Sequence, residues 1–152
     1  MELKAKINQD LKNALRSGDH TVCDTLRLLK SEVTNQEISL GLRESGLSDD
    51  QVEQVVMKEA KKRREAAEMY SKAGRAELAE REKTELEILK NYLPKMLSEA
   101  EVRQIVDEAV NNFGSKPVLS DMGKIIGVVK SKVGNSADGA MVALLVKERL
   151  SQ

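Results

Sequence analysis

The residue types that could perform catalysis are sparse in this chain of 152 residues. The single histidine, His20, precedes the single cysteine, Cys23, by three positions. A Cys–His nucleophile pair needs a third group that orients the base, and none stands nearby in the sequence. A structural zinc site needs about four protein ligands, and the chain has no further histidine or cysteine. We therefore predict no catalytic residue, no metal site and no bound cofactor.

Carboxylates are abundant, but their arrangement does not predict acid–base chemistry. The chain has 25 Asp and Glu against 25 Lys and Arg, so its formal net charge is zero. We expect Glu82, Glu85 and Glu87 to lie on an exposed, charged helix, where no burial would shift their pKa values. The sequence also has no Gly-rich phosphate loop and no nucleophile elbow. Enzymatic activity of this chain on its own is therefore not expected.

Two glycines in the last third of the chain form the most informative pattern. At 100° per residue, Gly123, Gly127 and Lys130 fall together on one side of a predicted helix. An adjacent side carries the apolar residues Met122, Ile125, Ile126, Val129 and Val133. Each glycine costs about 1 kcal/mol relative to alanine in a helix interior, so a local reason is expected. Two interpretations stay open: tight packing against another helix of the same domain, or close approach of an RNA sugar–phosphate backbone, with Lys124 and Lys130 supplying charge.

The charge around this strip favours a polyanion. Residues 115–150 carry six Lys and Arg against three Asp and Glu, so this end is locally basic. We add Lys132 and Lys147 to Gly123, Lys124, Gly127 and Lys130 as the predicted RNA-binding residues. The only aromatic residue between residues 95 and 152, Phe113, belongs to an apolar face. Stacking of bases on aromatic rings is therefore not expected, and any RNA contact should read the shape and backbone of a folded RNA.

The densest basic run lies elsewhere, at Lys61, Lys62, Arg63 and Arg64. Four consecutive residues fan around most of a helix, so they do not form one patch. Three ion pairs at i, i+4 spacing are predicted here: Glu59–Arg63, Lys61–Glu65 and Arg64–Glu68. This favours a solvated helix face, with RNA contact at a secondary basic cluster as the alternative.

The elements that position these residues are predicted to be helices throughout. Apolar residues recur at helical spacing, for example at Leu3, Ile7, Leu11 and Leu15, and no segment alternates with period two. Capping boxes at Ser48 with Gln51 and at Ser98 with Glu101 open two of the helices. Pro94 interrupts the pattern. We predict an all-α fold, with an elongated N-terminal helical bundle over residues 1–94 and a three-helix C-terminal domain over residues 95–152.

The last helix is expected to begin at Ser136 as N-cap, with Asp138 in its first turn. One cysteine fits a reducing compartment, and no apolar run approaches the length that crosses a membrane. The N-terminal residues lack the apolar core of a signal peptide. These features predict a cytoplasmic protein without a membrane partner.

Several short elements, taken in order and spacing, resemble those of the GatB/YqeY family over essentially the whole chain. In the N-terminal part they are Leu26-Arg27-Leu28-Leu29 with Asn35, Glu37 and Ile38, then Lys62-Arg63-Arg64, Tyr70, Ala73-Gly74-Arg75, Leu78-Ala79 and Tyr92-Leu93-Pro94 with Leu97-Ser98. In the C-terminal part they are Asp121-Met122-Gly123-Lys124 and Ala137-Asp138-Gly139 with Val142, Val146 and Lys147. Family members often carry a basic residue just before the Ala-Asp-Gly turn, where this chain has Asn135-Ser136. That departure shifts any phosphate contact to Lys124, Lys130, Lys132 and Lys147.

The resemblance implies a helical N-terminal domain and a tail similar to that of the B subunit of the tRNA-dependent amidotransferase. In that enzyme the tail helps to hold the misacylated tRNA, while the chemistry occurs in a separate catalytic domain that has no counterpart here. The implied function is a non-catalytic tRNA-binding or tRNA-metabolism accessory protein. One alternative is a protein-interaction module that docks an amidotransferase or an aminoacyl-tRNA synthetase. Another, by family inheritance, is carbon–nitrogen ligase activity with glutamine as the amido-N donor.

Overall fold

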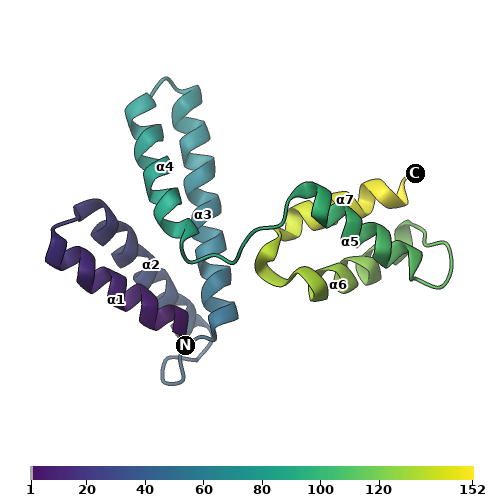
Figure 1. Ribbon diagram of the computed structural model, residues 1–152, viewed down its shortest axis with the longest axis horizontal. Helices are drawn as coiled ribbons and strands as arrows, with labels where there is room; N and C mark the ends of the chain where they lie inside the picture. Colours follow the sequence, from purple (N-terminus) through teal and green to yellow (C-terminus); the bar gives the residue numbers. More distant parts are fainter. Residues whose placement is uncertain (1) are drawn as a thin grey trace. The chain divides into compact units, whose positions relative to one another are not determined.

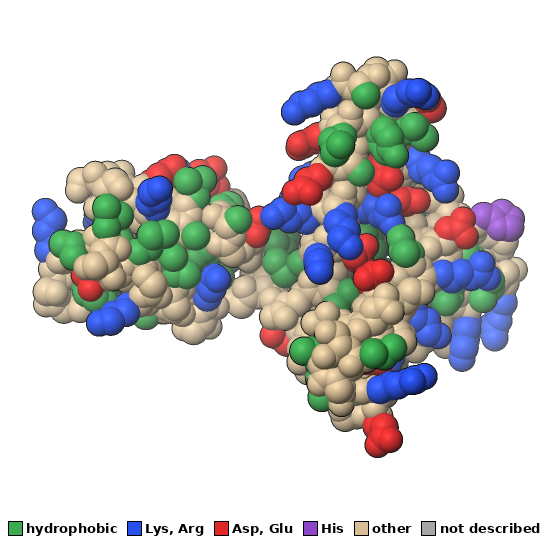
Figure 2. Space-filling model, turned by 180° about the vertical axis from the view of Figure 1, so that it is seen from behind, with side chains coloured by type: hydrophobic (Ala, Val, Ile, Leu, Met, Phe, Trp, Pro, Cys, Tyr) green, Lys and Arg blue, Asp and Glu red, His purple; other side chains and the backbone are tan. Residues whose placement is uncertain are grey.

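The all-α prediction is confirmed. The computed structural model describes residues 2–152, and within them it contains seven α-helices, two short 3-10 helices and no strand (Figure 1). The chain divides into two compact units, one ending at Leu93 and the other spanning Pro94–Gln152. We call them the N-terminal and C-terminal units. Charged side chains of both signs cover much of the surface in Figure 2.

Two helical hairpins build the N-terminal unit. The first pairs α1 (Glu2–Ser17) with α2 (His20–Ser39), and the second pairs α3 (Asp49–Lys72) with α4 (Ala76–Lys90) (Figure 1). Gly74, with a φ of 73°, turns the chain between α3 and α4 in a conformation that side chains disfavour. The predicted capping box at the start of α3 is present, since Ser48 and Gln51 satisfy each other's backbone N–H groups.

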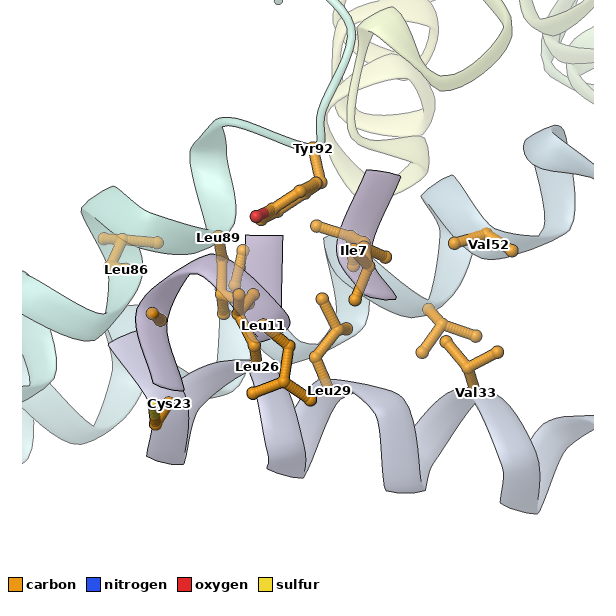
Figure 3. Close-up of a cluster of buried hydrophobic side chains, with 14 of the residues drawn as sticks. Ile7, Leu11, Cys23, Leu26, Leu29, Val33, Val52, Leu86, Leu89 and Tyr92 are labelled. Atoms are coloured by element: carbon orange, nitrogen blue, oxygen red, sulfur yellow. The ribbon is translucent and has the colours of Figure 1, made fainter. Parts of the chain in front are cut away.

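One apolar cluster holds both hairpins of the N-terminal unit together. Its buried members come from all four helices and include Ile7, Leu11, Leu26, Leu29, Val52, Leu86 and Leu89 (Figure 3). Leu15 was expected on the same stripe as Ile7 and Leu11, but it is exposed, and Ala14 is buried in its place. The reason is geometric, because residues four apart advance 40° around a helix and the stripe rotates away from the core.

Tyr92 joins the end of this unit to its first helix. Its hydroxyl donates a hydrogen bond of 2.7 Å to Asp10, and the amino group of Lys6 lies 5.3 Å from the ring centroid. Burial and the Asp10 carboxylate raise the pKa of the Tyr92 hydroxyl well above its ordinary value. Tyr92 therefore stays a neutral donor at physiological pH and fixes the segment that leads to Pro94.

Three helices build the C-terminal unit around a second apolar cluster. They are α5 (Glu99–Asn111), α6 (Met122–Val133) and α7 (Gly139–Leu150), with 3-10 turns η1 (Leu119–Asp121) and η2 (Gly134–Ser136) flanking α6. The predicted apolar side of α6 faces the core, since Ile125, Val129 and Val133 are buried. Ion pairs from Arg103 to Glu148 and from Arg149 to Asp107 join α5 to α7.

The predicted start of the last helix was wrong. Asp138, not Ser136, is the N-cap of α7, and its carboxylate accepts the N–H of Ala140 at 3.1 Å. Ser136 instead belongs to η2, and its carbonyl accepts the N–H of Leu97 at 2.8 Å. Between them Ala137 is extended and buried in the core. Because Ala137 is extended, the helix starts only after it, and the start of α7 lies nearer the C-terminus than predicted.

Candidate nucleic-acid interface

The glycine strip of α6 faces solvent. Gly123 and Gly127 are both exposed, and a methyl group placed on either one would have no neighbouring atom within 4 Å. Neither glycine has a positive φ, so backbone conformation does not require glycine at these positions. Tight packing within the C-terminal unit is therefore excluded as the reason for the glycines. What remains is a bare stretch of helix surface that another molecule could approach closely.

Two predicted lysines border this strip. Lys130 is exposed and shares the side of α6 that bears the glycines, while Lys124 is exposed about 100° around the helix from Gly123. A methyl group on Gly139 would lie 3.5 Å from both Cε and Nζ of Lys130. The side chain of Lys130 thus reaches from α6 to the start of α7, so its charge lies at the junction of the two helices.

The other two predicted lysines lie farther from the strip. Lys132 is exposed near the end of α6, about 180° around the helix from Gly123. Lys147 is exposed on α7, which runs antiparallel to α6 (Figure 1). The structure therefore groups Gly123, Gly127 and Lys130 on one side of α6, places Lys124 beside that strip, and puts Lys132 on the opposite side of the helix.

Exposed apolar side chains accompany the lysines, and the sequence interpretation missed them. Val118 and Leu119 precede α6, Val128 lies on it, and Leu144 lies on α7 with 56% of its surface exposed. Figure 2 shows hydrophobic side chains gathered on the C-terminal unit, at the left, with basic side chains around them. Val128 and Leu144 could have been noticed, because both fall outside the apolar stripe of their own helix.

The secondary basic cluster does not form a basic patch. The side chain of Arg63 is only 19% exposed, and its Nη1 lies 3.3 Å from carboxylate oxygens of both Glu82 and Glu85 on α4. Lys62 pairs with Glu59 at 2.9 Å, and this contact raises the pKa of Lys62. Glu59 thus pairs with Lys62 and Arg63 pairs across to α4, whereas an i, i+4 pair between Glu59 and Arg63 was predicted. Lys61 and Arg64 remain exposed.

The expectation that Glu82 and Glu85 are solvent-exposed was also wrong. Their side chains are 15% and 12% exposed, because both turn towards Arg63 between the two helices of the hairpin. Glu87 is exposed as predicted and pairs with Lys90 at 2.8 Å. The spacing of residues along one helix could not show this cluster, since its members come from two helices.

Within residues 2–152, no group of three or more His, Cys, Asp or Glu side chains lies close enough to bind a metal ion. None of the described helices combines the length and apolar character that would let it cross a membrane. Cys23 is buried as a free thiol in the apolar cluster of the N-terminal unit.

Comparison with known proteins gives one family and several fungal relatives. The family model described as Yqey-like protein matches residues 4–150. The "Altered inheritance of mitochondria protein 41, mitochondrial" of Pyrenophora tritici-repentis is 24% identical, over 94% of this chain and 78% of the relative. The protein of the same name from Lachancea thermotolerans is 34% identical, over 72% of this chain and 56% of the relative. An uncharacterised protein of Schizosaccharomyces pombe is 32% identical, over 63% of this chain and 76% of the relative.

These relatives contradict the expected cytoplasmic location. Proteins from Pyrenophora tritici-repentis, Lachancea thermotolerans and Eremothecium gossypii that match this chain are all named as mitochondrial. The prediction relied on the single cysteine and on the first residues of the sequence, and neither feature distinguishes one reducing compartment from another.

Proposed function

We propose that this chain, which belongs to the YqeY-like protein family, holds a folded RNA against α6 of its C-terminal unit without catalysing a reaction. The observation that carries the proposal is the exposure of Gly123 and Gly127 beside Lys124 and Lys130. A helix surface without side chains lets a sugar–phosphate backbone lie close to the protein backbone, and the ammonium groups neutralise phosphates at its edge.

The kind of RNA follows from the side chains that this surface offers. It has lysines and small or aliphatic residues, and Phe113, the aromatic residue of the C-terminal unit, packs against the core. Base stacking on aromatic rings, which single-strand binders use, is therefore not available here. A folded RNA recognised by shape and backbone fits better, and the resemblance to the tail of the amidotransferase B subunit makes tRNA the first RNA to test.

Filter binding of the full chain to folded tRNA at two salt concentrations tests this function. We expect weak binding that falls steeply with salt, because each neutralised phosphate releases counterions. The double variant Lys124→Glu, Lys130→Glu should abolish binding at both concentrations. Its matched control is Lys12→Glu, Lys30→Glu, which changes net charge equally at exposed positions of the N-terminal unit and should retain binding.

Two results would contradict the RNA proposal. One is the absence of detectable tRNA binding at the lower salt concentration. The other is an equal loss of affinity in both charge-reversal variants, because that would assign binding to overall charge and not to the surface around the glycine strip. Unchanged melting temperatures would show that each variant still folds.

A second candidate function is protein interaction through the N-terminal unit. It is favoured by a cavity of about 430 Å³ among α2, α3 and α4, which has the exposed apolar residue Leu28 in its wall. Under this alternative the unit would dock a partner such as an amidotransferase or an aminoacyl-tRNA synthetase. Recovery of a protein partner that survives nuclease treatment would favour this function over RNA binding.

A further inference from the structure

The cavity among α2, α3 and α4 is lined by both apolar and charged side chains. Leu28 of α2, Tyr70 of α3 and Leu78 of α4 supply the apolar side chains. Asp24 and Glu82 lie among the charged residues that line the same cavity. Its volume, about 430 Å³, is within the usual range of about 300–1,000 Å³ for ligand pockets. It is therefore large enough to receive a long side chain from another protein.

Leu28 gives the cavity an exposed apolar edge, since 43% of its surface on α2 is exposed. Ala67 of α3 and Ala79 of α4 are already buried, so they offer no apolar surface to a partner. Met69 of α3 is exposed, but it lies about 100° around the helix from Tyr70 and away from the cavity. The apolar contact available beside the cavity is therefore Leu28.

The lining carries more negative than positive charge. Arg63 is the main counter-ion of two carboxylates, at 3.3 Å from each of Glu82 and Glu85. Arg81 lies 3.7 Å from Glu85 and is itself 68% exposed. Asp24, exposed on α2, adds a third carboxylate, so three carboxylates and two guanidinium groups line the cavity.

We propose that this groove docks an amphipathic helix of a partner protein that inserts a lysine or arginine side chain into the cavity. The inserted cation would lie by Asp24 and Glu82, and its methylene groups would pack along Leu28 and Leu78. An apolar residue one turn away on the partner helix would cover the exposed part of Leu28, as in other helix-in-groove complexes. The inference rests on the second candidate function above and gives it a surface and a partner chemistry.

A basic side chain suits this groove better than a metal ion does. The described residues hold no group of three or more carboxylate, imidazole or thiol ligands in metal-binding proximity. A guanidinium or ammonium group on an apolar stem suits both the apolar and the acidic lining residues, because the stem contacts Leu28 and Leu78 while the head meets the carboxylates. Asp24 and Glu82 face opposite charge in this complex, so they should also set partner selectivity.

Selection of a randomised helical peptide library on the full-length chain tests the proposal. We expect the selected peptides to share one Lys or Arg flanked by apolar residues three or four positions away. Replacing that residue by citrulline or glutamine should weaken binding by about tenfold or more, which corresponds to about 1.4 kcal/mol. Asp24→Asn and Glu82→Gln should each give a comparable loss. Glu87→Gln, an exposed carboxylate of α4, is the matched control and should bind normally.

The outcomes separate the inference from the function on which it rests. Binders that need no basic residue, or that ignore both Asp24→Asn and Glu82→Gln, would overturn the inferred chemistry while leaving protein interaction in place. A selection that yields no binder would overturn both. Because Asp24 is exposed and Glu85 still pairs with Arg63 in the Glu82 variant, these substitutions should not unfold the chain.

Discussion

The two units of this protein use charge in opposite ways. All the buried polar or charged side chains found among the described residues lie in the N-terminal unit: Thr25, Glu37, Glu59 and Glu85. Buried side chains of the C-terminal unit are apolar, and its lysines at 124, 130, 132 and 147 are exposed. Buried charge helps to assemble the first unit, whereas the ion pairs that join α5 to α7 in the second unit lie at its surface and the four lysines are exposed. The density of charged residues in a sequence therefore does not show where charge is available for binding.

The partners of the buried acids explain how the N-terminal unit tolerates buried charge. Glu37 is 3% exposed, receives the amino group of Lys4, and lies 3.4 Å from the backbone nitrogen of Leu47. It continues the stripe of the buried Val33 one helical turn farther along α2, while the neighbouring Ile38 is exposed. A buried carboxylate is tolerable when it is paired and hydrogen-bonded. The Glu37–Lys4 and Glu85–Arg63 pairs join separate helices, so they also specify how the helices pack, whereas Glu59 pairs with Lys62 of its own helix.

The largest expected effect comes from breaking a pair in the N-terminal unit. Arg63→Ala should lower the free energy of unfolding by about 3 kcal/mol, because two carboxylates that are mostly buried lose their main counter-ion. Lys124→Ala in the C-terminal unit should change stability by less than about 0.5 kcal/mol, as exposed residues usually do. Urea denaturation measures both. Equal effects in the two variants would contradict the contrast between the units.

A smaller effect of opposite sign is expected at the glycine strip. Gly123→Ala with Gly127→Ala should stabilise the C-terminal unit by about 1–1.5 kcal/mol, because Gly127→Ala gains about 1 kcal/mol of helix propensity in the helix interior, Gly123→Ala in the first turn gains less, and neither methyl group meets a neighbouring atom. The same change should weaken tRNA binding, since two methyl groups would stand between the helix and the RNA backbone. Thermal unfolding and filter binding measure the two quantities separately.

The stability and the tRNA affinity of the double alanine variant should therefore change in opposite directions. A double alanine variant that is more stable and binds tRNA as before would show that the bare strip is not a contact surface. Gly139→Ala is a useful companion, because its methyl group would touch Lys130 at an ordinary contact distance. That variant tests the position of Lys130 and leaves the strip unchanged.

Much of the fold could be predicted from the sequence, because its signals are local. The capping boxes at Ser48 and Ser98 and the apolar side of α6 were all correctly placed. Each depends on residues within about four positions of one another, where helix geometry fixes the contacts. The exposure of the glycines could not be derived, since spacing along α6 is equally compatible with a covering helix.

Contacts between different helices could not be predicted from the spacing of residues along one helix. Helical spacing offered Glu59 as a partner for Arg63, but the distance between α3 and α4 made Glu82 and Glu85 the actual partners. The i, i+4 rule considers only residues on the same helix, whereas a residue that faces a second helix can also pair with residues of that helix. The burial of Glu37 could not be predicted for a related reason, because Lys4, which pairs with it, lies on a different helix.

The smallest predicted effect tests the corrected start of α7 in the C-terminal unit. Asp138→Ala should destabilise the chain by about 1 kcal/mol, because the N–H of Ala140 loses the carboxylate that accepts it. Ser136→Ala should cost less than about 0.5 kcal/mol, since it is the Ser136 carbonyl, which alanine retains, that holds Leu97. Urea denaturation of both variants decides between the two caps, and a larger loss of stability for Ser136→Ala would restore the original assignment.

Asp138→Ala also removes a negative charge near Lys130, so it should strengthen tRNA binding while it weakens the fold. Such opposite changes in stability and in tRNA affinity would show, at a single residue, the contrast between charge that stabilises the fold and charge that is available to a partner.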